Sequence, residues 1–197
     1  MKIAIDIDKT IIDCDSFLYK ILNICQFKQS SNNKLRYKVI DNQIIYEENI
    51  IRKINKMFNS EYYYVIDDVV QIINELQANG DEIILLSRRP RIKPLINILL
   101  ICLYKYNINF SKIIIGCNNK AKYCSNNKVE LLIDDSYDAC INASKEGVNV
   151  IVYSKSYEFN NYKRNSSNNF KVAHNWKEID KYIKELKNQN NKVKICI

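Results

Sequence analysis

Glycine and proline are scarce in this sequence, with only 3 Gly and 2 Pro among 197 residues. Collagen-like chains and low-complexity chains depend on these two residues, so both classes are excluded. Because 47% of the residues are hydrophobic, the composition is that of a regular globular protein. A chain of this length can bury one large core, or one core together with a small accessory unit.

Long apolar runs and histidine are also scarce. No apolar run approaches the roughly 20 residues of a membrane span, and Asp6, Asp8 and Asp13 interrupt the place where a signal peptide would be hydrophobic. His174 is the single histidine, and the seven cysteines include no Cys-x-x-Cys pair, so a zinc site or a disulfide framework is not expected. We therefore expect a cytoplasmic protein with no membrane partner and with small, buried thiols.

Negative charge is in deficit, and the formal net charge is +8. A positive protein attracts anionic partners, which include phosphorylated substrates and nucleic acids. The lysines are scattered along the chain, however, and a high content of Asn and Lys is typical of an AT-rich genome. Charge alone therefore does not indicate a nucleic-acid partner.

Apolar runs alternate with amphipathic stretches over most of the chain, which is the pattern of a parallel sheet with helices on both faces. The sequence predicts five strands, at Lys2–Ile7, Glu82–Ser87, Lys112–Gly116, Val129–Asp134 and Val148–Tyr153. It predicts helices at Asp67–Asn79, Arg91–Tyr106, Asn119–Asn126, Ser136–Glu146 and Trp176–Asn188. The predicted fold class is α/β, a Rossmann-like three-layer sandwich with a five-stranded, mainly parallel sheet.

One segment breaks this alternation. Between Asp13 and about Tyr64 there is no second strand signal, only helix-like stretches at Phe17–Phe27 and Tyr46–Phe58. Roughly fifty residues are too many for a structureless loop in a compact domain. We expect a small helical unit at 17–63 that covers the end of the first strand, inserted into a core of 1–16 and 64–197. The alternative is a helical crossover that packs on the sheet and binds nothing.

Two pairs of acids follow predicted strands, at the edge of the sheet where open α/β folds bind ligands. Asp6 and Asp8 are two residues apart at the end of the first strand, so both carboxylates point to one face. Like charges placed in this way repel each other unless a cation lies between them. Asp134 and Asp135 end the fourth strand, and the sequence therefore predicts a divalent cation held by acids from both strands.

Hydroxyl and cationic residues follow the other two strands. Ser87, Arg88 and Arg89 end the second strand, and Lys120 and Lys122 open the helix after the third. These side chains could hold an anion beside the cation, and Lys120 is favoured over Lys122 by its spacing to the acids. Ser87 could instead cap a helix. Arg89 could bind a substrate phosphate or pair with an acid of the core.

In this order, the residues resemble the four motifs of the haloacid dehalogenase-like superfamily of phosphohydrolases. The motifs stand here as Asp6-Ile7-Asp8-Lys9-Thr10, Ser87, Lys120 and Asp134-Asp135. The predicted insertion is similar to the type-one cap of that superfamily, and Ser87-Arg88-Arg89-Pro90 is similar to the Thr-Ala-Arg-Pro form of its second motif. The runs Lys120–Cys124, Ile133–Ser136 and His174–Ile179 are similar to the bacterial branch of the 5'(3')-deoxyribonucleotidase-like proteins. Lys9 departs from the pattern, since many members have glycine there, and this leaves the turn after Asp8 open.

The resemblance implies a phosphomonoesterase whose cofactor is Mg²⁺. Asp6 would attack phosphorus and form an aspartyl-phosphate, while Asp8 would carry the proton to the leaving group. Ser87 and Lys120 would bind the phosphoryl oxygens. The implied metal ligands are Asp6, the backbone carbonyl of Asp8, and Asp134, with Asp135 as a direct ligand or as a partner that orients Lys120 or a metal-bound water. The further substrate contacts are expected from Thr10, Arg88 and Arg89.

The expected partner is a small phosphorylated substrate, with a nucleoside or deoxynucleoside 5'-monophosphate as the leading candidate. Alternatives are another small phosphomonoester, the ends of a nucleic acid, or a binding module that keeps the fold without catalysis. A cap that excludes polymers argues against nucleic acid. The sequence does not specify the substrate or the oligomeric state, because specificity in this architecture lies in the cap and in the loops that face it.

Overall fold

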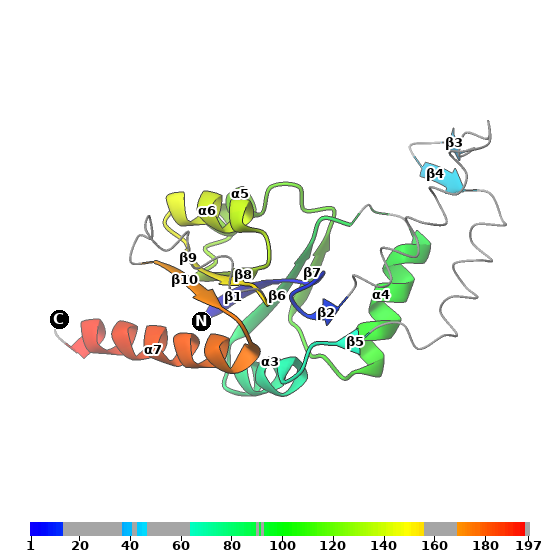
Figure 1. The fold of residues 1–197 in the computed structure, drawn as a ribbon. Helices are drawn as coiled ribbons and strands as arrows, with labels where there is room; N and C mark the ends of the chain where they lie inside the picture. Colours follow the sequence, from blue (N-terminus) through cyan, green and yellow to red (C-terminus); the bar gives the residue numbers. More distant parts are fainter. Residues whose placement is uncertain are drawn as a thin grey trace.

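The computed structural model describes residues 1–13, 37–40, 43–46, 64–89, 91, 93–155 and 169–195 (Figure 1). Its main sheet has six strands in the order β10-β9-β8-β1-β6-β7, and every neighbouring pair is parallel. The strands are β1 (Lys2–Asp6), β6 (Glu82–Ser87), β7 (Lys112–Ile115), β8 (Leu131–Asp134), β9 (Asn149–Tyr153) and β10 (Phe170–Ala173). The predicted α/β class and parallel sheet are confirmed.

The sixth strand, β10, is the difference from the predicted five. It is a four-residue edge strand that pairs with β9 alone. Phe170, Val172 and Ala173 are buried, whereas Lys171 is exposed. A short run interrupted by a charge is a weak strand signal, which is why the sequence pattern did not reveal it.

Helices cover both faces of the sheet because successive strand residues point to opposite sides. Ile3 and Ile5 of β1 join the hydrophobic cluster on one face, and Ala4 joins the cluster on the other. The first cluster includes residues of α3 (Val69–Ala78), α4 (Lys93–Lys105) and α7 (Trp176–Ile195). The second includes residues of α5 (Lys120–Asn126) and α6 (Tyr137–Lys145), and the result is a three-layer sandwich.

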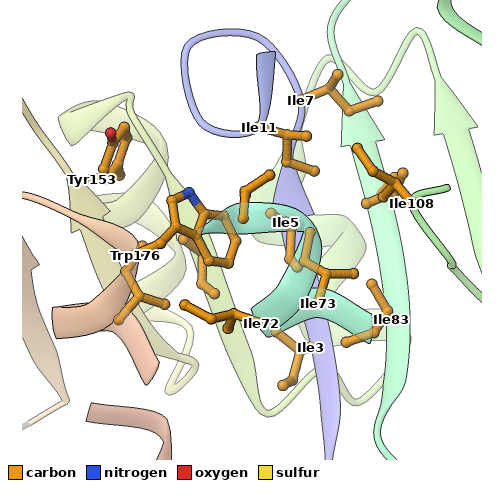
Figure 2. Packing of buried hydrophobic residues seen from close by; sticks show 14 of the residues in the cluster. Ile3, Ile5, Ile7, Ile11, Ile72, Ile73, Ile83, Ile108, Tyr153 and Trp176 are labelled. Carbon is orange, nitrogen blue, oxygen red and sulfur yellow. The ribbon is translucent and has the colours of Figure 1, made fainter. Parts of the chain in front are cut away.

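The larger cluster is built mainly of isoleucine around one tryptophan (Figure 2). Ile3, Ile5 and Ile73 are fully buried there, as is Trp176 at the start of α7. Burial of each such aliphatic side chain contributes about 1.5–3 kcal/mol. This cluster therefore fixes β1, and with it the acids that follow β1, against helices from both halves of the sequence.

The segment between β1 and α3 enters and leaves the core at one place. Strand β2 (Ile12–Asp13) pairs antiparallel with β5 (Tyr64–Val65), so the residues that flank segment 14–63 lie side by side next to the loop after β1. This agrees with an insertion at that position, although the boundaries 17–63 and the covering role stay predictions. The expected helix at Phe17–Phe27 lies outside the described residues.

The described part of the insertion is a hairpin, in which β3 (Tyr37–Ile40) pairs antiparallel with β4 (Gln43–Tyr46). The expectation that this segment holds no strand is therefore wrong at the hairpin. Tyr46 belongs to β4 instead of starting a helix, and the rest of the expected helix Tyr46–Phe58 lies outside the described residues. Asp41 and Asn42 separate two β-branched runs, and this two-residue turn signal could have revealed the hairpin.

Candidate active site

The site lies where the strand order reverses. Strands β6 and β7 lie on one side of β1 within the sheet. The chain then returns past β1, and β8, β9 and β10 lie on its other side. Open α/β sheets bind ligands at the carboxyl ends of the strands at this switch point. Asp6 ends β1, Ser87 ends β6 and Asp134 ends β8, so three of the predicted residues meet there.

Lys120 connects two of the acids. Its ammonium donates hydrogen bonds to the carboxylates of Asp6 and Asp134, with 2.7 Å from Nζ to Oδ2 of Asp134. All three side chains are buried, and Lys122 is exposed, so the geometry favours Lys120 as the cation of the site. Burial alone would lower the pKa of Lys120, but the two carboxylates outweigh it and raise that pKa.

A third acid completes a cluster on this edge. Oxygen atoms of Asp6, Asp134 and Asp135 all lie within 4.8 Å of one another. Burial and the nearby Asp134 raise the pKa of Asp135 to about 6, and the same two causes raise the pKa of Asp6 well above its usual range despite Lys120. Three crowded carboxylates are an all-oxygen donor set, which suits a hard divalent cation such as Mg²⁺. The contribution of the Asp8 carbonyl stays a prediction.

Arg89 is bound to Asp8. Its Nε lies 3.0 and 2.9 Å from the two carboxylate oxygens of Asp8, and its Nη2 donates to Oδ1 as well. Arg89 therefore forms the expected ion pair with an acid of the core, whereas its contact with a substrate phosphate stays a prediction. The Asp8 side chain is still 25% exposed at the edge of the sheet, so this pair orients Asp8 without burying it.

The loop after β1 closes tightly on itself. The amides of Ile11 and Ile12 both donate to the carbonyl oxygen of Ile7, and the amide of Lys9 donates to Ile12 O at 2.8 Å. Lys9 has φ 64°, the left-handed region that favours glycine and costs other residues about 1–2 kcal/mol. The turn therefore has the left-handed backbone conformation that glycine adopts readily, although the residue is lysine. The Lys9 side chain is exposed at the edge of the site.

Thr10 lies beneath the site. Its hydroxyl is fully buried and donates to Oδ2 of Asp6 at 3.4 Å. This contact suits a residue that orients Asp6, whereas the expected contact between Thr10 and a substrate stays a prediction.

The residues after β6 separate into a buried hydroxyl and an exposed cation. Ser87 is buried, and its Oγ accepts a hydrogen bond from the amide of Arg89 at 3.0 Å. It is not the cap of α4, because that helix begins at Lys93. Arg88 is exposed beside it.

Sequence reasoning missed the contribution of Trp176. Its indole Nε1 donates to the carbonyl oxygen of Thr10 at 2.9 Å, from a residue 166 positions away. His174 lies just before it, with Nδ1 at 2.7 Å from Ser154 O, and Asn175 accepts from the amide of Glu178 where α7 begins. The start of α7 therefore holds the loop that carries Asp8. A tryptophan at a predicted helix start was the available signal, but it did not indicate what the indole would contact.

We expect Trp176→Phe to lower the free energy of unfolding by about 2 kcal/mol and to reduce activity. The substitution leaves the Thr10 carbonyl buried without its donor, which costs about 1–3 kcal/mol, and it loosens the turn that positions Asp8. Urea unfolding and steady-state kinetics would measure both effects. Tyr182→Phe, in the same helix, should change the unfolding free energy by less than about 0.5 kcal/mol. Equal stability of the two variants would contradict this assignment.

Comparison with known proteins identifies the fold. No protein-family model and no curated sequence matches the chain. A predicted phosphatase from Clostridium acetobutylicum has a TM-score of 0.60 at 18% identity, and the match covers 93% of this chain and 98% of that one. A Had-superfamily hydrolase from Ehrlichia chaffeensis has a TM-score of 0.52 at 17% identity, covering 94% and 96%.

A third similar structure was solved with a phosphorylated ligand. It is a mutant of CbbY from Rhodobacter sphaeroides in complex with xylulose-1,5-bisphosphate, with a TM-score of 0.59 at 12% identity, covering 88% of this chain and 93% of that one. At these identities the similarity establishes the fold alone. This chain has the α/β fold of the haloacid dehalogenase-like hydrolases.

Proposed function

We propose that the protein is a phosphomonoesterase that works through an aspartyl-phosphate intermediate. The observation that carries the proposal is the buried contact of Lys120 with both Asp6 and Asp134 at the switch point of the sheet. Purely structural burial of two acids and one lysine is costly, because each charge must be removed from water. In a site that binds a phosphate dianion, however, a buried ammonium can stabilise the negative charge of the phosphoryl oxygens.

The first half-reaction transfers the phosphoryl group to Asp6. A bond forms between a carboxylate oxygen of Asp6 and phosphorus, and the bond from phosphorus to the leaving oxygen breaks. Protonated Asp8 gives its proton to that oxygen, so the product leaves as an alcohol. Arg89 donates to both oxygens of the Asp8 carboxylate, so it stabilises the form of Asp8 that this proton transfer produces.

The second half-reaction returns the enzyme to its starting state. Asp8 takes a proton from water, the water oxygen bonds to phosphorus, and the bond to Asp6 breaks to release phosphate. Lys120 and Ser87 provide donors to the phosphoryl oxygens, which carry the charge in both steps. Mg²⁺, held by Asp6 and Asp134 with Asp135 beside them, would neutralise phosphoryl charge and align the attacking group when bound.

The best substrate candidate is a nucleoside or deoxynucleoside 5'-monophosphate. Its support is the similarity of the runs Lys120–Cys124, Ile133–Ser136 and His174–Ile179 to the bacterial branch of the 5'(3')-deoxyribonucleotidase-like proteins. A sugar phosphate is the second candidate, since a protein with the same fold was solved with xylulose-1,5-bisphosphate.

A substrate panel tests the function. Purified protein would be assayed for phosphate release from p-nitrophenyl phosphate, nucleoside 5'-monophosphates and sugar phosphates, with Mg²⁺ and with excess EDTA. We expect turnover with Mg²⁺ and a loss of at least about 100-fold in EDTA, because the acids then repel the phosphate. The highest kcat/KM in the panel would identify the substrate class. Binding of phosphate without turnover of any compound would favour a non-catalytic binding module.

A further inference from the structure

A groove of about 540 Å³ lies between α5 and α6, which are side by side on one face of the sheet (Figure 1). Small buried residues, Ala121 of α5 and Ala139 of α6, line it and leave space between the helices. Lys120 also lines the groove. The described lining includes none of the four acids of the site, which are Asp6, Asp8, Asp134 and Asp135. The groove therefore adjoins the candidate active site and is distinct from its acid cluster.

Three exposed cations line the groove, Arg88, Lys122 and Lys145. Within the described ranges, none of the three forms an ion pair with a carboxylate. Among the described residues that line the groove, Glu146 is the one acid. The groove therefore has an excess of positive charge that the described protein does not neutralise.

Apart from Ala121 and Ala139, the uncharged residues of the described lining have short polar side chains. Asn118, Asn126 and Asn142 each present an amide, and Ser125 presents a hydroxyl. Amides and hydroxyls donate to the oxygens of an anion, and the described lining has no aromatic or large aliphatic side chain to bind an apolar group. Pockets of roughly 300–1,000 Å³ accommodate small-molecule ligands. The chemistry and the size together indicate a hydrophilic anion that carries phosphate.

We propose that the α5–α6 groove is a second anion-binding site, which takes a phosphate-bearing group in addition to the phosphate at Asp6. That group is the second phosphate of the substrate or a separate phosphate-bearing ligand. The two sources share the chemistry that Arg88, Lys122 and Lys145 recognise. Anion binding in the groove is independent of catalysis, whereas any link to the substrate rests on the proposed phosphatase function.

Direct binding would be measured with inorganic pyrophosphate at low salt and without divalent cations, by ¹H–¹⁵N NMR titration of the whole chain. We expect shifts of the amide signals of Asn118, Asn126 and Asn142. The double variant Lys122→Ala/Lys145→Ala should bind at least about 10-fold more weakly at these positions, because charge-assisted hydrogen bonds are lost.

A matched control removes the same charge elsewhere. Lys112 and Lys181 are exposed and lie outside the groove, so Lys112→Ala/Lys181→Ala should bind pyrophosphate as the wild type does. Absence of shifts in the groove, or equal weakening in the two double variants, would overturn the proposal.

Kinetics would distinguish the two sources. If the substrate supplies the second phosphate, the wild type should prefer fructose 1,6-bisphosphate to fructose 6-phosphate, and Lys122→Ala/Lys145→Ala should reduce that preference about 10-fold with the monophosphate rate unchanged. If the ligand is separate, pyrophosphate at constant free Mg²⁺ should alter the monophosphate rate of the wild type more than that of this variant. Groove binding in a protein with no phosphatase activity would count against the proposed function and support the site.

Discussion

Asp6→Asn should abolish phosphate release, with kcat lowered by about 10⁴-fold or more, the range expected when a catalytic nucleophile is removed. An amide has almost the shape of a carboxylate but cannot attack phosphorus. It also removes one of the negative oxygens that Lys120 contacts. The measurement is phosphate release under saturating Mg²⁺ with the best substrate of the panel.

A measurement of the stability of Asp6→Asn shows whether the variant is inactive because it lacks the nucleophile or because it is unfolded. Asp6 is buried near Asp134 and Asp135, so a neutral amide at that position relieves repulsion between acids. We expect Asp6→Asn to unfold in urea at a concentration no lower than the wild type does. Asp138→Asn, at an exposed position in the first turn of α6, is the matched control and should retain full activity. Substantial turnover by Asp6→Asn would mean that water attacks phosphorus directly.

The predictable part of this molecule is the part in which local pattern and burial agree. Strands β1, β6 and β8 each contain a continuous apolar run because both of their faces are covered, and each ends at the polar residue that follows this run. Asp6, Ser87 and Asp134 could therefore be placed at one sheet edge from the sequence. Glycine after a helix is a similar local signal, because Gly80 and Gly147 follow the C-cap residues of α3 and α6 and have φ of 83° and 82°.

The parts that could not be predicted depend on contacts between distant residues. The ion pair of Arg89 with Asp8 joins residues 81 positions apart, and the sequence left it as one of two alternatives. The bond from Trp176 to Thr10 has no local signature at either end. The groove between α5 and α6 arises from two small residues, Ala121 and Ala139, whose facing positions depend on how the helices pack. Sequence periodicity gives the buried face of a helix but not its neighbour.

Lys120→Met should remove activity and also destabilise the protein in the absence of metal. Asp6 and Asp134 would stay buried without the ammonium that both of them contact. Removal of one partner from a buried ion pair costs about 3–5 kcal/mol, a large share of the roughly 5–15 kcal/mol that stabilises a typical domain. Urea unfolding in EDTA would measure the cost, and phosphate release with Mg²⁺ would measure the activity, which we expect to fall at least about 1,000-fold.

The effect of Mg²⁺ on the stability of Lys120→Met distinguishes the loss of a positive charge from a general packing defect. In Lys120→Met the acids have no other positive neighbour among their described hydrogen-bond partners, so Mg²⁺ should raise the unfolding free energy of this variant more than that of the wild type. Lys122→Met is the matched control, because Lys122 is exposed and should change neither stability nor the rate on a simple monophosphate. If Lys122→Met is inactive and Lys120→Met is active and stable, the cation of the site is Lys122, and the assignment of Lys120 is wrong.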